Sequence, residues 1–426
     1  MESSCPKEAH IFCGPTTLSR GLCVENERQC STRSTGLRPV PQTPENTIGK
    51  KYSYTEDYLG RHCYFSEDTL KVDYDQSFTN GESVPANFSC LTYNIWGLAR
   101  TEAQKHLFEL RQPLLEATIR ESGADLLCLQ EMSAFSYERL SNLIGQYKFA
   151  SEIPYPIKSV PERNRAVDTY FLSKYQPSRV TLYGLPGVLG YENCLLVVEY
   201  PNLVLFNLYN QAGSKSSPGQ AQKWIHYSRC RYDILQTIYD MILRRYSLQN
   251  IIICGDFNFH LDGEVHEWPE MEMIYKFAAL GFVDTYRTLN PTKTGYTEDT
   301  DRNVMRWNQK LIEKHYRYDG ILFRSTNAFC KPSKSVLIGT DHECLSVAES
   351  EWFVNEVSEV KPDELDKLTQ CARNRSRKLR LPINASDHFG VLTRFTSFRG
   401  GKRFKKTRRL RQMQKSKIEP KNKTNK

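Results

Sequence analysis

The sequence predicts an α/β protein built around a mixed β-sheet. Three observations support this fold class. Short apolar segments typical of buried strands recur along the chain, longer segments with helical spacing lie between some of them, and other pairs of strands are joined by short connections typical of hairpins. The chain has 426 residues, which is enough for one large α/β domain with extensions.

The individual elements follow from the spacing of apolar residues. FSCLTYNIW alternates in hydropathy and predicts the first strand, and the continuous run LLCLQ predicts a buried strand that ends at Glu131. Helical spacing predicts helices at Leu107–Glu121 and Tyr227–Tyr246 and a further helix at Glu351–Cys371. The expected strands are Phe88–Trp96, Leu126–Gln130, Tyr170–Leu172, Leu195–Tyr200, Leu203–Leu208, Ile251–Cys254, Gly320–Phe323 and Gly390–Phe395.

Changes in composition divide the chain into three parts. Residues 1–84 are polar and rich in turn formers, and we expect a partly ordered N-terminal extension. Residues 85–397 form the α/β domain, with a polar insertion at about 341–380 that ends in the basic cluster Arg373–Arg380. Residues 398–426 form a basic tail that is expected to be disordered.

Composition excludes several classes of protein. Apolar residues make up 39% and charged residues 25% of the chain, which excludes a fully disordered protein. The sequence contains no apolar run near the ~18–20 residues of a membrane span, and its start lacks the pattern of a secretory signal. We therefore expect a soluble intracellular protein of the cytoplasm or nucleus, with peripheral membrane contact as an open alternative.

Positive charge is concentrated in the tail. The net charge is +9, whereas residues 399–426 alone contain thirteen Lys or Arg and one acid, Glu419. The rest of the chain is therefore close to neutral. A basic arm of this kind is expected either to contact nucleic acid or an anionic membrane surface, or to act only as a solvated tail.

The thirteen cysteines show no repeated spacing and no Cys-x-x-Cys pair. Cys128, Cys194 and Cys254 lie inside apolar runs, where a free cysteine behaves as a small buried hydrophobe. We therefore expect reduced thiols, with neither a disulfide framework nor a zinc site.

Polar side chains stand at or just past the ends of several apolar runs. Ligands bind at the carboxyl ends of strands in α/β folds, and carboxylates gathered there repel one another unless a cation neutralises them. Their oxygens are hard ligands, which favours Mg²⁺, with Mn²⁺ as an alternative, over zinc. These residues are Asn94, Glu131, Asp256, Asn258, Asp319, Asp387 and His388.

In this order, the segments resemble the endonuclease/exonuclease/phosphatase (DNase I-like) superfamily of metal-dependent phosphoesterases. The most specific parts are Gly-Asp-x-Asn at 255–258 and Ser-Asp-His at 386–388. The resemblance runs from about residue 88 to 396. It implies a four-layer α/β sandwich, two mixed β-sheets packed face to face and flanked by helices.

The resemblance also implies a role for each matching residue. Glu131 is the main metal ligand, assisted by Asn94 and Asp387. Asp256 activates or orients the attacking water, and Asn258 holds that water or a phosphate oxygen. His388 contacts the scissile phosphate and is oriented by Asp319, while the division of acid and base roles between Asp256 and His388 stays open.

One strand departs from the common pattern. Most relatives carry Asn/Thr-x-His-Leu before the long helix, but Tyr209 stands where the histidine is expected in Phe-Asn-Leu-Tyr-Asn. Abasic-site endonucleases also have a tyrosine there. Tyr209 is therefore either a hydroxyl donor to the phosphate or a packed strand residue.

Three functions remain open at this stage. Neutral sphingomyelinases have the motifs most similar to Thr92–Leu98 and Gly281–Arg287. This resemblance favours a phosphodiesterase that acts on a phospholipid headgroup. The basic tail and the Arg373–Arg380 cluster favour an Mg²⁺-dependent endonuclease or nucleic-acid end-processing enzyme. The third is an inactive family member that acts as a binding protein.

Overall fold

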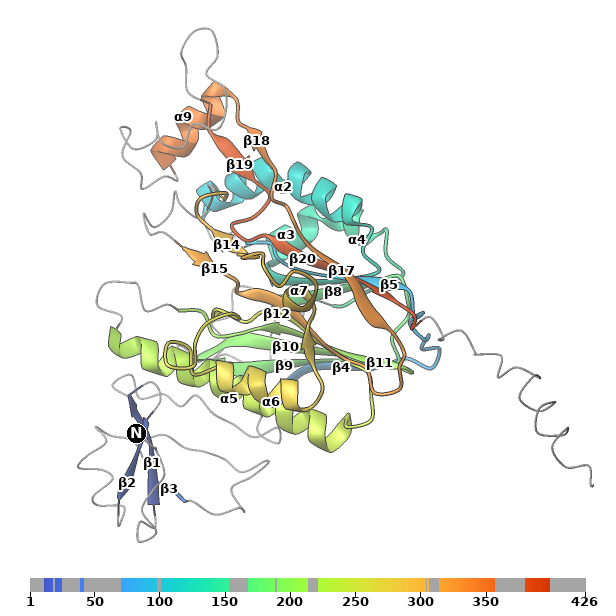
Figure 1. The fold of residues 1–426 in the computed structure, drawn as a ribbon. Helices are drawn as coiled ribbons and strands as arrows, with labels where there is room; N and C mark the ends of the chain where they lie inside the picture. The colour runs from blue at the N-terminus through green and yellow to red at the C-terminus, as the bar shows by residue number, and fades with distance from the viewer. Residues whose placement is uncertain are drawn as a thin grey trace, which may run out of the picture.

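The computed structural model describes residues 11–17, 20–24, 39–41, 70–97, 101–152, 168–187, 190–213, 221–303, 305, 314–356 and 380–398. Two large mixed sheets pack face to face with helices outside them (Figure 1), so the predicted four-layer α/β sandwich is confirmed. A separate three-stranded sheet contains β1 (Ile11–Thr17), β2 (Arg20–Val24) and β3 (Pro39–Pro41).

The first large sheet has the strand order β13-β16-β12-β11-β10-β9-β4. Strands β11 and β12 run parallel, and the other pairs are antiparallel. Its strands are β4 (Lys71–Ser77), β9 (Arg179–Gly187), β10 (Gly190–Tyr200), β11 (Leu203–Tyr209), β12 (Ile251–Asp256), β13 (Val283–Asp284) and β16 (Asp319–Arg324).

The second large sheet has the order β17-β20-β5-β6-β8-β7, in which β5 and β6 run parallel. Its strands are β5 (Phe88–Asn94), β6 (Leu126–Met132), β7 (Phe149–Ala150), β8 (Asp168–Ser173), β17 (Lys331–Ile338) and β20 (Gly390–Thr396). The structure also contains two short antiparallel strand pairs. These are β14 (Glu298–Asp299) with β15 (His315–Tyr316) and β18 (His342–Cys344) with β19 (Pro382–Asn384).

Alternation along the strands separates the layers. On β5, Cys90 faces the core between the sheets, whereas Leu91 packs in the core beneath α2 (Glu102–Ser122). On β12, Ile252 faces the inter-sheet core and Ile253 packs in the core with α5 (Ala221–Arg245). The remaining helices are α3 (Ala134–Arg139), α4 (Ser141–Ile144), α6 (Met271–Ala279), α7 (Thr285–Leu289) and α9 (Val347–Glu356).

Helix α2 is defined by signals at both ends. The Thr101 hydroxyl accepts a hydrogen bond from the Gln104 backbone N–H, and the Gln104 side chain accepts one from the Thr101 backbone N–H. These two bonds form a capping box. The helix ends at Gly123, whose φ of 62° is left-handed. Between these ends, Phe108 and Leu115 bury one face against the second sheet, and this packing holds the helix beside the end of β5.

The parallel pairs bring the predicted site residues to one edge. Asn94 lies opposite Gln130 on the neighbouring strand, next to Glu131, and Tyr209 lies opposite Asp256. Because the two sheets face each other, the ends of these four strands converge on one region between the sheets.

Some sequence expectations need correction. Strand β4 pairs with β9 at the edge of the first large sheet. Lys71–Ser77 therefore belongs to the sandwich, although the sequence predicts an N-terminal extension for residues 1–84. The helix expected at 351–371 begins earlier, as α9, and residues 357–379 and 399–426 lie outside the described residues. Among the residues that the structure describes, no helix is long and apolar enough to cross a membrane.

The cysteine expectation was wrong for part of the chain. Cys230 and Cys344 are each disulfide-bonded, which corrects the prediction of reduced thiols throughout. Cys128, Cys194 and Cys254 are free and buried as predicted, and Cys90 and Cys330 are also free and buried.

Gly255 is a position where a side chain cannot be accommodated. Its φ is 140°, and an added Cβ would lie 1.9 Å from the Leu208 carbonyl oxygen on the neighbouring strand. We predict that Gly255→Ala lowers the free energy of unfolding by about 2–4 kcal/mol. The added methyl group would push β11 away from β12, and alanine would be strained at this φ. Chemical denaturation measures the change.

Gly145→Ala is the matched control. Its Cβ would meet the nearest backbone atom, the Ser141 oxygen, at 3.6 Å, and its backbone is right-handed helical. This variant is expected to stay within about 0.5 kcal/mol of the natural protein. Equal stability of the two variants would show that β11 and β12 do not approach this closely.

Candidate active site

Asn94 links two carboxylates at the converging strand ends. Its side-chain amide donates to Glu131 Oε1 at 3.1 Å and to Asp256 Oδ2 at 3.0 Å. The Asn94 Oδ1 atom accepts from the Trp96 backbone N–H at 3.0 Å. Asn94 is fully buried, so it fixes the position of one carboxylate from each sheet.

Glu131 adopts an unusual backbone conformation. Its φ is 58°, and the pairing of β6 with β8 shifts register between Leu129 and Met132. A β-bulge of this kind re-aims a side chain. The Tyr209 hydroxyl donates to Glu131 Oε1 at 3.0 Å, so Tyr209 is part of the site and is not only a packed strand residue.

Asp256 has both carboxylate oxygens held. Oδ1 accepts from the Asn258 backbone N–H at 2.8 Å, and Oδ2 accepts from Asn94. Asn258 has a left-handed φ of 56°, and its side-chain amide donates to the Asn210 carbonyl at 3.0 Å. The turn after β12 therefore supplies one of the two donors that orient Asp256, and Asn94 on β5 supplies the other.

His388 and Asp319 form a buried pair. The distance from His388 Nδ1 to Asp319 Oδ2 is 2.8 Å, and both side chains are almost fully buried. Asp319 lies opposite Asp256 in the β12–β16 pairing. One ligand atom from each of Asp256, Asp319 and His388 lies within 4.8 Å of the others, which places this pair beside the Asn94 network.

Asp387 is buried next to this group. Ser386 Oγ donates to the Asn94 carbonyl at 2.7 Å, which fastens the loop before β20 to the end of β5. The charge of Asp387 raises the pKa of Glu131, and burial is the larger cause of that increase. The structure thus brings every residue of the predicted set into one region.

The electrostatics of the site show a shortage of positive charge. Burial raises the pKa of Asp256 to about 8, and the charge of Asp319 adds to the increase. Burial lowers the pKa of His388, but the charge and hydrogen bond of Asp319, together with Asp387 and Asp256, raise it well above its ordinary value. The imidazole is therefore cationic at neutral pH.

The residues fit a hard divalent cation. Glu131, Asp256 and Asp387 are buried, and desolvation raises the pKa values of Glu131 and Asp256, which a positive charge beside them would oppose. Their donor atoms are oxygens, as in Mg²⁺ and Mn²⁺ sites. The donor set is therefore compatible with the predicted cofactor.

Sequence reasoning missed Glu298, on β14, and Lys314, which directly precedes β15. Glu298 Oε1 lies 3.6 Å from His388 Nε2, and Lys314 Nζ lies 2.9 Å from Glu298 Oε2. Both are buried although their segments are polar. A buried acid in a two-residue strand and a buried base beside such a strand leave no hydrophobic pattern by which the sequence could have revealed them.

Arg111 was also missed. It lies on α2, is fully buried, and donates to the carbonyls of Ile95, Trp96 and Ala385. These contacts join the segment after Asn94 to the segment before Asp387. Arginine at such a position in a helix is ordinary on a solvated face, so only the fold reveals its role.

The comparisons with known proteins come from a family model and from solved structures. A model described as the Endonuclease/Exonuclease/phosphatase family matches residues 91–310, just over half of the chain. No curated protein matches the sequence.

Several solved structures are similar in fold. TDP2 from Caenorhabditis elegans has 14% identity and a TM-score of 0.45 and covers 73% of this chain and 74% of its own. D. rerio TDP2 complexed with single strand DNA product has 15% identity, a TM-score of 0.41 and coverages of 73% and 99%. The 3′-5′ exonuclease (NExo) from Neisseria meningitidis has 16% identity, a TM-score of 0.44 and coverages of 72% and 99%.

We predict that Mg²⁺ or Mn²⁺ stabilises the protein through Glu131. A ligand present at 100 times its dissociation constant stabilises the folded state by about 2.7 kcal/mol. Glu131→Gln should remove this gain, because the amide carries no charge to balance the cation. Thermal unfolding with and without each ion measures it.

Glu121→Gln, on the exposed side of α2, is the control and should keep the full metal-dependent gain. If both variants respond to the ions as the natural protein does, Glu131 is not a ligand.

Proposed function

Because the chain belongs to the endonuclease/exonuclease/phosphatase family, we propose that it hydrolyses a phosphodiester bond with the assistance of a divalent metal ion. The observation that carries this proposal is the buried network joining Asn94, Glu131 and Asp256 beside the His388–Asp319 pair. A binding protein has no need for this combination of buried acids and an oriented imidazole.

Glu131 would hold the metal, with Asp387 and Asn94 assisting. When bound, it supplies positive charge that neutralises the phosphate and the buried acids. Asn94 also donates to Asp256, so it couples the metal side of the site to the residue proposed to handle the nucleophile.

Asp256 would orient the attacking water, and it would accept the proton of that water once a cation beside it lowers the raised pKa of its carboxyl group. The donors on both of its oxygens fix the carboxylate plane, and each oxygen retains a lone pair for the water. Asn258 lies beside it to hold the water or a phosphate oxygen. Holding the nucleophile in line with the scissile bond removes much of the entropic barrier.

His388 stabilises the charge that develops on phosphorus oxygens. Asp319 holds Nδ1, which leaves Nε2–H directed to the opposite side of the ring, where Glu298 lies. Tyr209 keeps its proton, since burial raises its pKa well above the ordinary value, and its hydroxyl donates to Glu131 Oε1, so that it positions this carboxylate. Water attacks phosphorus and gives a proton to Asp256, the ester P–O bond breaks, and the leaving oxygen takes a proton from the His388 imidazolium or from solvent water.

We propose nucleic acid as the substrate class, an assignment that comes from charge. The tail carries thirteen basic residues and one acid, and phosphate contacts of Lys and Arg supply most of the affinity for nucleic acid. The likeness to the solved structures concerns the fold alone, so this chain's own residues support the assignment.

A phospholipid headgroup is the second candidate. The segments Thr92–Leu98 and Gly281–Arg287 resemble the corresponding motifs of neutral sphingomyelinases. A basic tail also suits an anionic membrane surface. A substrate panel of plasmid DNA, single-stranded DNA, RNA, sphingomyelin micelles and phosphoinositides separates the two candidates.

We predict that His388→Ala lowers kcat at least about 100-fold, because a donor to the phosphate is lost. EDTA should abolish the activity, and added Mg²⁺ or Mn²⁺ should restore it. Turnover of the preferred substrate of the panel is the measurement.

The control is His266→Ala, which removes an exposed histidine and should leave kcat unchanged. If no member of the panel is hydrolysed in either metal, the chain is an inactive family member. Activity that survives EDTA would exclude the metal.

Removal of residues 399–426 gives a separate prediction for the nucleic-acid assignment. The shortened chain should bind DNA at least about tenfold more weakly at low salt and show a shallower salt dependence, because fewer phosphates are neutralised. Its kcat at saturating DNA should stay within twofold.

Binding and its salt dependence are measured by fluorescence anisotropy at several salt concentrations. Unchanged DNA binding, with lost binding to anionic vesicles, would instead favour the phospholipid candidate.

A further inference from the structure

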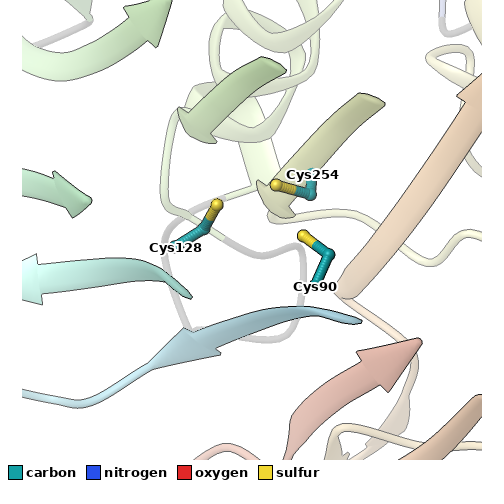
Figure 2. A group of neighbouring side chains, drawn as sticks. All are labelled: Cys90, Cys128 and Cys254. Atoms are coloured by element: carbon teal, nitrogen blue, oxygen red, sulfur yellow. The ribbon is translucent and has the colours of Figure 1, made fainter. Parts of the chain in front are cut away.

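Three free thiols meet between the two sheets. Cys90 comes from β5, Cys128 from β6 and Cys254 from β12, and their Sγ atoms lie within 4.8 Å of one another. Figure 2 shows the three sulfur atoms directed toward a common point. Each side chain is completely buried. We call this group the thiol cluster.

We propose that the thiol cluster is a binding site for a thiophilic divalent metal ion, with zinc as the cellular ion. Thiolate sulfur is a soft ligand that selects such ions over Mg²⁺. A zinc–sulfur bond of about 2.3 Å places the sulfurs of a three-thiolate site roughly 4 Å apart. The separations in this structure reach that arrangement with a small movement of the side chains.

The surroundings favour a divalent over a monovalent ion. The cluster lies in a core that includes Phe171 and Ile252, where net charge is costly. Three thiolates around a divalent ion leave one negative charge, whereas three around Cu⁺ leave two. The smaller residual charge is the less expensive one to bury.

A thiol must lose its proton in order to bind a metal ion. Uptake of an ion by the thiol cluster therefore releases protons, and loading should improve as pH rises.

The position of the cluster relates it to the candidate active site. The strands that carry Cys90 and Cys254 end in Asn94 and Asp256, and Glu131 is the last residue but one of the strand that carries Cys128. At about 3.3 Å per residue, the thiols lie roughly 7–13 Å along the strands from those residues. A bound ion would join both sheets beneath the active site and stabilise their relative placement.

The full chain, produced in medium supplemented with zinc or cadmium, tests the site. We expect the natural protein to hold one more ion per chain than Cys128→Ala or Cys254→Ala, measured by elemental analysis after desalting. The cadmium-loaded protein should show the ultraviolet thiolate-to-cadmium charge-transfer band, and the two variants should lack it. Zinc should also raise the thermal midpoint of the natural protein more than that of Cys128→Ala or Cys254→Ala.

Two controls make the result specific. Cys330→Ala removes a free buried thiol outside the cluster and should keep the ion and the band. Glu131→Gln alters the oxygen site and should keep the charge-transfer band. This second control separates the thiol cluster from the site proposed for catalysis, so either can fail alone.

Because an alanine variant can fail to fold, the natural protein alone also decides the question. A natural protein without zinc or cadmium after supplementation overturns the proposal. A metal content that is equal in folded cluster variants and the natural protein also overturns it.

Discussion

The structure depends on one electrostatic constraint, the gathering of buried acids at a single edge of two facing sheets. Glu131, Asp256, Asp319 and Asp387 are taken out of water by the packing of the strands that carry them, and their mutual repulsion opposes folding. The protein itself supplies two cations beside them, His388 and Arg111, and neutral donors from Asn94 and Tyr209. The divalent cation that we propose would add to this positive charge and would also neutralise the phosphodiester under attack.

The scaffold holds this edge with groups that do not touch the reacting atoms. Arg111 joins the segments that follow β5 and precede β20 through three carbonyls. Asn303 donates to the Ser386 carbonyl at 2.8 Å, and the Phe389 N–H donates to the Thr297 carbonyl at 2.8 Å. The segment bearing Asp387 and His388 is therefore fixed from both sides, which spares the site the cost of ordering when substrate binds.

The residues that the sequence predicted share one property. Asn94, Glu131 and Asp256 each follow an apolar strand, so both the strand and its polar end are visible in the pattern. Arg111 and Glu298 could not be found in this way, because a buried charge in a helix or a two-residue strand looks like a surface charge. Strand β4 was missed for a related reason, since Lys71–Ser77 is largely polar and lies at the edge of its sheet.

The burial of single cysteines could be predicted from the sequence, but their meeting in the thiol cluster could not. Cys128 and Cys254 were predicted to be buried, and they are, but burial of single residues carries no information on which of them meet. Cys90, Cys128 and Cys254 meet because β5, β6 and β12 cross at the centre of the sandwich. The same three strands therefore present sulfur near their middle and oxygen at or near their ends. This difference in ligand hardness would direct the two proposed ions to different sites.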